Sequence, residues 1–154
     1  MKKRYFYLFL LILLFTACRA DSDTDQAERA LIRFFDLLSN EAYPAAAELY
    51  GGSYETLQAF NPDLDPNNHE ALWRNGCQVN GLQCRPVYSV TLIEHKPPGE
   101  YVFIVEFTDS EGNRLVIEGC CGETVSPPIS RFEYRVVNLG DQQYRILDPP
   151  VYVP

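Results

Sequence analysis

The sequence is poor in the residues on which catalysis and nucleic-acid binding usually depend. It contains two histidines, and its 13 lysines and arginines are outnumbered by 21 acidic residues. Affinity for nucleic acids comes largely from cationic side chains that neutralise phosphates, so this balance predicts no nucleic-acid partner.

Short motifs for common reactions are missing as well. The chain has no serine nucleophile elbow, phosphate-binding glycine loop or dinucleotide fingerprint. It also has no Cys-x-x-Cys pair for redox catalysis. The two histidines, His69 and His95, lie at a predicted helix start and beside a predicted turn, where solvated roles are expected. We therefore expect no catalytic residue, no metal site and no cofactor.

The long uncharged apolar run at the start of the chain is too short to span a membrane. Residues 1–4 are cationic, residues 5–15 carry no charge, and small residues follow. A helix that crosses a bilayer needs about 20 apolar residues. The charge, length and small-residue end of this run are typical of a secretory signal peptide, which we assign to residues 1–17.

Leu14-Phe15-Thr16-Ala17-Cys18 ends the apolar run and resembles the lipobox of bacterial lipoproteins. The resemblance implies that the Cys18 sulfur receives a diacylglycerol, that the chain is cut before Cys18, and that the new amine is acylated, for example with palmitate. Residues 18–24 would then be a lipidated tether that holds the protein on the extracytoplasmic side of the cell membrane. Each buried methylene contributes about 0.8 kcal/mol to such an anchor. Removal of residues 1–17 takes away three cations and changes the net charge from −8 to −11, so the membrane link is expected to be covalent.

Four further cysteines are expected to form disulfides, because the chain is predicted to leave the cytoplasm. They are Cys77, Cys84, Cys120 and Cys121, and they allow three connectivities. A bridge between Cys120 and Cys121 would close a strained ring, so two bridges from the 77–84 segment to this pair are favoured. The local pair Cys77–Cys84 is the alternative. The spacings do not match those usual in structural zinc sites.

The clearest amphipathic helix follows the tether. Apolar residues recur at helical spacing from Ala27 to Leu38, with charged residues elsewhere around the helix. Ser22 and Asp25 have the spacing of a capping box, which places the start of the helix near them.

Three shorter helical segments are expected after this helix. Pro44 suits the first turn of one of them, and Gly51-Gly52 ends it. Gly76 is expected to end the last, on which Trp73 is a core anchor. The segments are residues 45–50, 54–60 and 69–74.

From Pro86 onward the apolar period changes from 3.6 to two, as in strands. The turn at residues 109–113 is typical of a hairpin. The predicted strands are residues 88–93, 101–107, 115–117, 132–136 and 144–147. Helices followed by an antiparallel meander indicate a single α+β domain at 25–148. The prolines at 149–154 predict an extended C-terminal tail.

The helical pair ALIRFFDLL at 30–38 and YPAAAELY at 43–50 resembles the opening of the nuclear transport factor 2-like, or SnoaL-like, family. The resemblance covers roughly residues 25–148 as a pattern of elements. It implies a cone-shaped α+β fold, in which N-terminal helices pack on a curved antiparallel sheet of four to five strands. Here, disulfide-linked loops would be added. The family contains both enzymes and binding modules, so fold analogy predicts little about function.

An aromatic sheet face able to line a cavity favours a binding role. The chain has ten tyrosines, nine phenylalanines and one tryptophan. The candidate ligand-binding residues are Phe103, Phe107, Phe132 and Tyr134. The leading hypothesis is a non-enzymatic binding or accessory module of the cell envelope, which binds a small apolar ligand or an envelope protein.

Two alternatives remain open at this point. The first is a small isomerase, dehydratase or hydrolase that uses a buried carboxylate. The strand residues Glu106, Glu118 and Glu133 alternate with the aromatic face, so they are expected to point outward, with Arg135 as a cross-strand partner. The second alternative is a purely structural envelope component.

Overall fold

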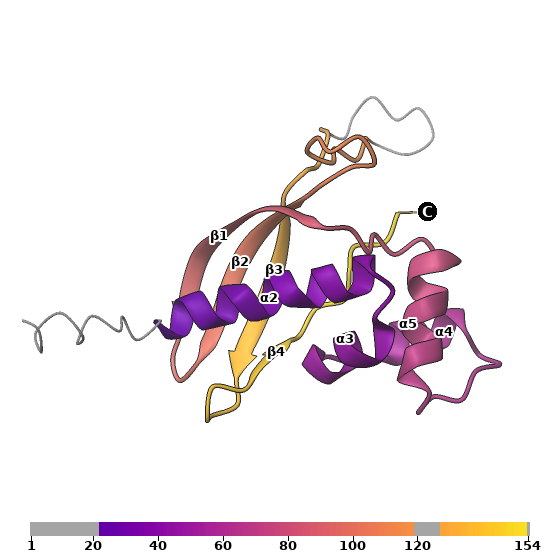
Figure 1. The fold of residues 1–154 in the computed structure, drawn as a ribbon, viewed down its shortest axis with the longest axis horizontal. Coiled ribbons are helices and arrows are strands. Elements are labelled where there is room, and N and C mark those ends of the chain that lie inside the picture. Colours follow the sequence, from indigo (N-terminus) through magenta and orange to yellow (C-terminus); the bar gives the residue numbers. More distant parts are fainter. Residues whose placement is uncertain (1–21, 119–126, 154) are drawn as a thin grey trace, which may run out of the picture.

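The computed structural model describes residues 22–118 and 127–153. The predictions for residues 1–17, Cys18, Cys120 and Cys121 lie outside the described residues. The described part is an α+β domain of helices and one sheet (Figure 1). Its elements are α2 (Asp23–Ser39), α3 (Tyr43–Leu49), α4 (Glu55–Phe60), α5 (His69–Gln78), β1 (Val87–Lys96), β2 (Glu100–Phe107), β3 (Phe132–Asn138) and β4 (Tyr144–Ile146). Among these helices none is long and apolar enough to cross a membrane.

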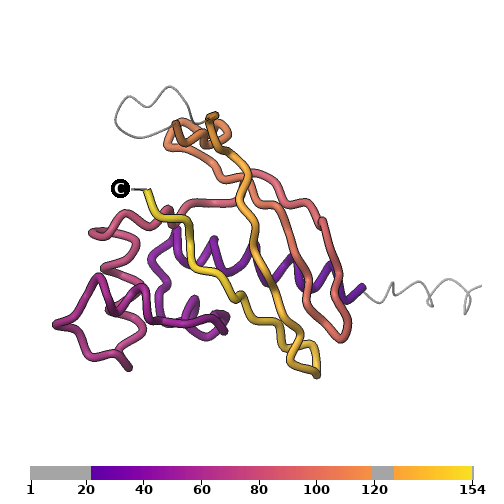
Figure 2. The backbone as a smooth tube through the Cα atoms, turned by 180° about the vertical axis from the view of Figure 1, so that it is seen from behind, coloured from indigo at the N-terminus to yellow at the C-terminus, as the bar shows by residue number. Residues whose placement is uncertain are grey.

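The four strands form an antiparallel meander in the order β1-β2-β3-β4. Helix α2 lies across one face of this sheet, and from behind the strands lie in front of it (Figure 2). Helices α3, α4 and α5 gather at the C-terminal end of α2. The predicted α+β class and antiparallel sheet are thus confirmed, with four strands in the described sheet.

The start of helix α2 and the face that it buries are those that its sequence predicts. The Ser22 hydroxyl accepts a hydrogen bond from the Asp25 amide at 3.2 Å, and the Asp25 carboxylate accepts one from the Ser22 amide at 3.2 Å. This capping box satisfies two backbone donors that the first turn of a helix leaves unpaired. The buried residues recur three and four positions apart, and they are Ala27, Leu31, Phe34, Phe35 and Leu38.

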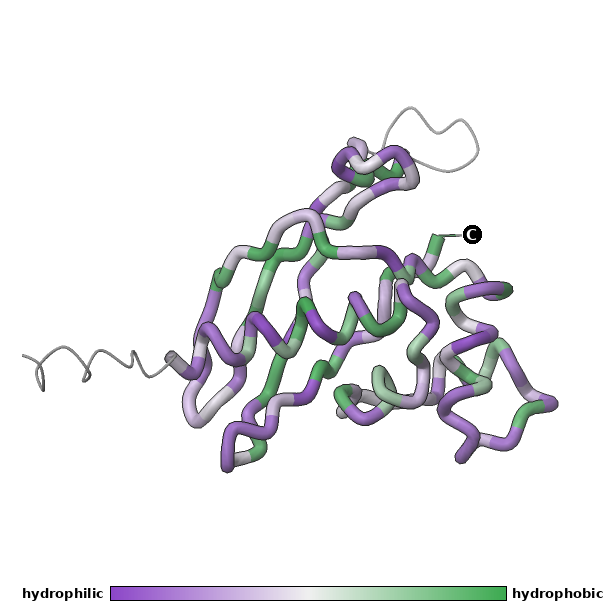
Figure 3. The backbone as a smooth tube through the Cα atoms, in the orientation of Figure 1, coloured by the Kyte–Doolittle hydropathy of each residue, from purple (hydrophilic) through white to green (hydrophobic). Residues whose placement is uncertain are grey.

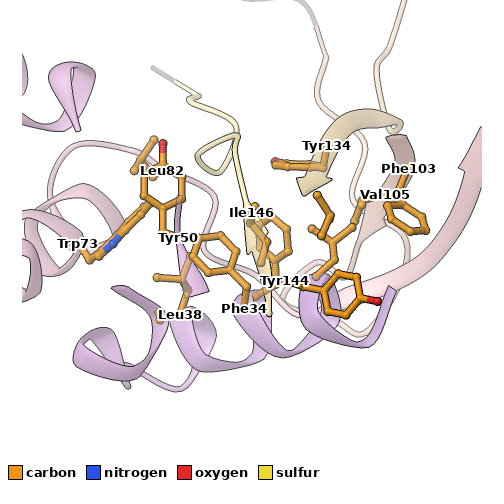
Figure 4. Close-up of a cluster of buried hydrophobic side chains, with 14 of the residues drawn as sticks. Phe34, Leu38, Tyr50, Trp73, Leu82, Phe103, Val105, Tyr134, Tyr144 and Ile146 are labelled. Carbon is orange, nitrogen blue, oxygen red and sulfur yellow. The ribbon is translucent and has the colours of Figure 1, made fainter. Parts of the chain in front are cut away.

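The aromatic face of the sheet packs on this stripe of α2 and forms the core (Figure 4). Phe35 contacts Phe107 and Tyr134 edge to face, with ring centroids 4.7 and 4.9 Å apart. Such arrangements contribute about 0.5–1.5 kcal/mol each beyond the area that they bury. Trp73 of α5 is fully buried against Phe34, which confirms it as a core anchor.

Helix α5 does not end at Gly76, so that prediction was wrong. The helix continues to Gln78, and Gly76 is a buried position within it. A Cβ atom at Gly76 would lie 2.8 Å from a methyl group of Leu57 and 2.8 Å from one of Leu82. The glycine therefore permits a close approach of chain segments, and it is not a helix stop.

The favoured disulfide connectivity was also wrong for the two described cysteines. Cys77 is bonded to Cys84, which is the local pairing kept as the alternative. The chain leaves α5 and reverses at Gly81, whose φ of +85° suits glycine. This reversal brings the two Cα atoms within 5.5 Å, the usual separation for a disulfide.

The predicted strand at 115–117 is not part of the sheet. The chain makes isolated bridges there, between Thr108 and Arg114 and between Ile117 and Ile129. These bridges form a projection beyond the ends of β2 and β3 (Figure 1). The turn at 109–113 is present, because the Asp109 carboxylate accepts from the amides of Glu111 and Asn113.

The chain covers the β4 edge of the sheet and then docks its C-terminal tail on the helical end. Tyr50 bridges to Ile146 in parallel, and the Gly51 amide donates to the Ile146 carbonyl at 2.8 Å. In the tail, the Val151 amide donates to the Tyr134 hydroxyl at 3.1 Å. The Val151 carbonyl accepts from the Gln83 amide at 2.8 Å, so the tail also holds the disulfide loop in place.

Candidate binding groove

The predicted ligand-binding residues lie in the core of the domain. Phe103 and Phe107 are fully buried and Tyr134 is 2% exposed, whereas Phe132 is half-buried beside Phe107. Burial also raises the pKa of the Tyr134 hydroxyl. These four side chains fill the interior against α2, and they line neither of the two described grooves.

A groove of about 890 Å³ lies between α2 and β4, and we call it the α2–β4 groove. One wall is a face of α2, and the other is the β3–β4 turn with β4; Leu49 of α3 completes it. The lining residues are Gln26, Arg29, Ala30, Ile32, Arg33, Asp36, Leu49, Gln142, Gln143, Tyr144 and Arg145.

Local sequence places the groove residues on one side of α2. On α2 the groove residues recur three or four positions apart, next to the buried stripe: they are Gln26, Arg29, Ala30 and Arg33. Because α2 carries both a buried apolar stripe and polar groove residues, hydrophobic and hydrophilic positions alternate along it (Figure 3). The β3–β4 turn opposite is hydrophilic.

The positive charge of the groove contrasts with the acidic chain around it. The lining contains three arginines, Arg29, Arg33 and Arg145, and one carboxylate, Asp36, in a chain of net charge −8. Four of the other described cations form ion pairs, which join Arg74 to Glu70, Lys96 to Glu94 and Glu100, Arg114 to Glu106, and Arg135 to Asp148. Arg33 and Arg145, like Arg85 and Arg131 elsewhere, form no ion pair with any described residue.

Gly51 allows the groove wall to form around Arg145. A Cβ atom at Gly51 would lie 2.7 Å from the Cβ of Arg145 and 3.3 Å from its Cγ. The backbone of the 50–51 segment therefore rests directly on the stem of this arginine. The Arg145 guanidinium also donates to the Tyr144 carbonyl at 3.2 Å.

Tyr144 is a nearly buried residue of the groove, at 5% exposure. Its hydroxyl donates to Asp23 at 3.4 Å and accepts from the Asn138 side chain at 3.4 Å. Burial and then the negative charge of Asp23 raise the pKa of Tyr144. The phenol thus stays protonated, and it links β4 to the first turn of α2.

The strand carboxylates do not have the surroundings of a general acid. Glu106 accepts a hydrogen bond from Ser89 at 2.6 Å and pairs with Arg114 at 3.1 Å. The Ser89 hydrogen bond lowers the pKa of Glu106, aided by Arg114. A buried general acid or base near neutral pH needs the opposite shift. The predicted pairing with Arg135 was wrong, because Arg135 pairs with Asp148.

The remaining candidate groups of an acid–base pair are exposed or stacked on tyrosines. Glu118 and Glu133 are exposed. The His69 ring stacks on Tyr54 with centroids 3.9 Å apart, and the His95 ring stacks on Tyr101 at 4.4 Å.

A second groove, of about 380 Å³, surrounds the disulfide. Cys77, Cys84, Glu41 and Arg85 are among its lining residues. Within residues 22–118 and 127–153, no three His, Cys, Asp or Glu side chains are grouped so that they could hold a metal ion.

Comparison of the chain with protein-family models, with curated proteins and with solved structures finds no match. The α2–β4 groove is the feature that sequence reasoning missed. Arg29 and Arg33 were visible as charges on α2, but Arg145 lies more than a hundred residues downstream. The pairing of β4 with β3 and its packing on α2 bring it to the same groove.

Proposed function

We propose that this chain is a membrane-tethered lipoprotein whose domain is a non-enzymatic binding module on the extracytoplasmic side. The short apolar leader and the lipobox resemblance at Cys18 support the tether. The disulfide between Cys77 and Cys84 agrees with an oxidising compartment.

The observation that carries the binding role is the α2–β4 groove. Its volume of about 890 Å³ is within the range of small-molecule sites, and it combines cationic, amide and apolar lining. The aromatic core offers no comparable space, because its rings pack on each other and on α2. Accordingly, we place the ligand in this groove and not against the aromatic sheet face.

A structural role in the envelope is the second candidate, favoured by the filled core. Thermal unfolding of the protein with a panel of lipids and metabolites separates the two. A ligand present at about 100 times its Kd stabilises the folded state by about 2.7 kcal/mol, which raises the Tm by several degrees. No shift with any compound would argue for the structural role.

The tether is tested independently of ligand binding. Wild-type protein should partition into detergent and carry added lipid mass, and a Cys18→Ser variant should do neither. Partitioning and lipid mass that persist in the variant would refute the anchor at Cys18.

A further inference from the structure

We infer that the α2–β4 groove binds a phosphate ester, which is either a soluble organic phosphate or the headgroup of a phospholipid. This inference rests on the proposal that the domain is a binding module. It names the chemistry of the ligand, which nothing in the chain's leader or cysteines indicates.

The first step is the unbalanced charge of the groove. Arg33 of α2 and Arg145 of β4 line the groove from its two walls, and neither forms an ion pair with a described residue. Asp36 is the one carboxylate of the lining, and it pairs with neither of these two arginines. A bound anion would neutralise the two guanidinium groups.

The second step is the geometry of the donors. A guanidinium presents its N–H groups in a rigid fork that matches a phosphate, and Arg–phosphate hydrogen bonds are charge-assisted. Here the forks of Arg33 and Arg145 come from two walls, α2 and β4, and the amide side chains of Gln142 and Gln143 line the groove beside them. Two arginines without an ion-pair partner among the described residues favour a doubly charged phosphate over a single carboxylate group.

The third step is the apolar part of the lining. Ala30, Ile32 and Leu49 contribute to the same groove, and they favour a ligand with a carbon skeleton over bare inorganic phosphate. If Cys18 is acylated, the chain from Cys18 to Asp23 spans at most about 18 Å. The groove begins at Gln26, one turn into α2, so lipid headgroups and soluble phosphates can both reach it.

The experiment measures binding by isothermal titration calorimetry with the mature lipidated protein, which begins at Cys18, in nonionic detergent. The probes are glycerol 3-phosphate and dihexanoyl phosphatidic acid, with dihexanoyl glycerol as the neutral comparison. The variants Arg33→Gln and Arg145→Gln each remove one cation from the groove. Arg74→Gln is the matched control, since Arg74 is exposed, lies outside the groove and pairs with Glu70. Circular dichroism and the Tm verify that each variant is folded.

We expect the phosphate probes to bind and the neutral probe to bind poorly. Arg33→Gln and Arg145→Gln should each weaken binding at least about tenfold, as for the loss of a hydrogen bond between charged groups. Arg74→Gln should change affinity by no more than about twofold. Equal affinity for both phosphate probes assigns the groove to soluble phosphate esters. Binding of phosphatidic acid alone assigns it to phospholipid headgroups.

Any one of three results would overturn the inference. The first is that neither phosphate probe binds, and the second is that the neutral probe binds as tightly as phosphatidic acid. The third is that both groove variants keep the wild-type affinity. If the phosphate probes fail while another compound of the panel raises the Tm, the binding module stands and the phosphate chemistry falls. If no compound binds at all, both fall together.

Discussion

Replacement of Gly76 by alanine tests whether close packing or helix propensity decides the stability of α5. Gly76 is buried in the interior of the helix. On an exposed helix the change would stabilise the protein by up to about 1 kcal/mol, since glycine is the poorer helix former. In this structure the new Cβ would lie 2.8 Å from methyl groups of Leu57 and Leu82. Real Cβ atoms do not tolerate such a distance, so at least one leucine has to move.

The cost of that movement exceeds the propensity gain. Leu57 and Leu82 are 2% and 6% exposed, so both are held by packed neighbours. Overpacking of a core by one methyl group costs about 1–3 kcal/mol. We therefore expect Gly76→Ala to lower the free energy of unfolding by about 1 kcal/mol after the gain in propensity. This is a sizeable part of the about 5–15 kcal/mol that stabilises a typical domain.

Equilibrium urea unfolding measures this change, with an unchanged m-value as the sign that the unfolded state is unaffected. Ala71→Gly on the same helix is the matched control, because it reports propensity without the clash. A double-mutant cycle with Leu82→Ala isolates the contact: in that background Gly76→Ala should be less harmful, with a coupling of about 0.5 kcal/mol or more. A Gly76→Ala protein more stable than the wild type would refute the packing argument.

Three further predictions concern the disulfide, the tail and the strand carboxylate. Replacing Cys77 and Cys84 by serine should cost about 2.5 kcal/mol in urea unfolding for so short a loop; an unchanged midpoint would contradict this. Tyr134→Phe leaves the Val151 amide without its acceptor, so it should lower the free energy of unfolding by about 0.5–1.5 kcal/mol and speed hydrogen exchange at Val151. An unchanged exchange rate at Val151 would mean that other contacts hold the tail. The pKa of Glu106 is lowered by folding, so its stabilisation is present above its ordinary pKa and lost as the pH falls through the folded value. Glu106→Gln should therefore be less stable than wild type near neutral pH, and the urea midpoints of the two proteins should converge on acidification. A difference between the midpoints that stays constant with pH would contradict the stabilisation by ionised Glu106.

The parts of the fold that were predictable have local causes. The capping box at Ser22 and Asp25 lies within one turn, and the buried stripe of α2 repeats with the period of the helix. The aromatic face of β2 alternates with the period of a strand, and its burial against α2 followed from that pattern. In each case a single element carries enough information to determine which of its sides is buried.

The errors have non-local causes. Gly76 looked like a helix end because glycine is a poor helix former, whereas its neighbours Leu57 and Leu82 come from other segments. The segment 115–117 was predicted as a strand from its sequence pattern, yet Ile117 bridges to Ile129 and the segment lies outside the sheet. Such a pattern indicates an extended segment, but it does not identify the segment with which it pairs.

The sequence by itself determined the charge balance, the amphipathic α2 and the antiparallel meander, because the patterns of α2 and of the strands depend on neighbours a few positions apart. Only the tertiary structure decided which cysteine Cys77 binds, and that aromatic side chains such as Phe103 fill the core where a ligand was expected. It also decided that Arg145 shares a groove with Arg29 and Arg33. These outcomes depend on where the chain turns and how strands and helices pack, which bring together residues far apart in the sequence.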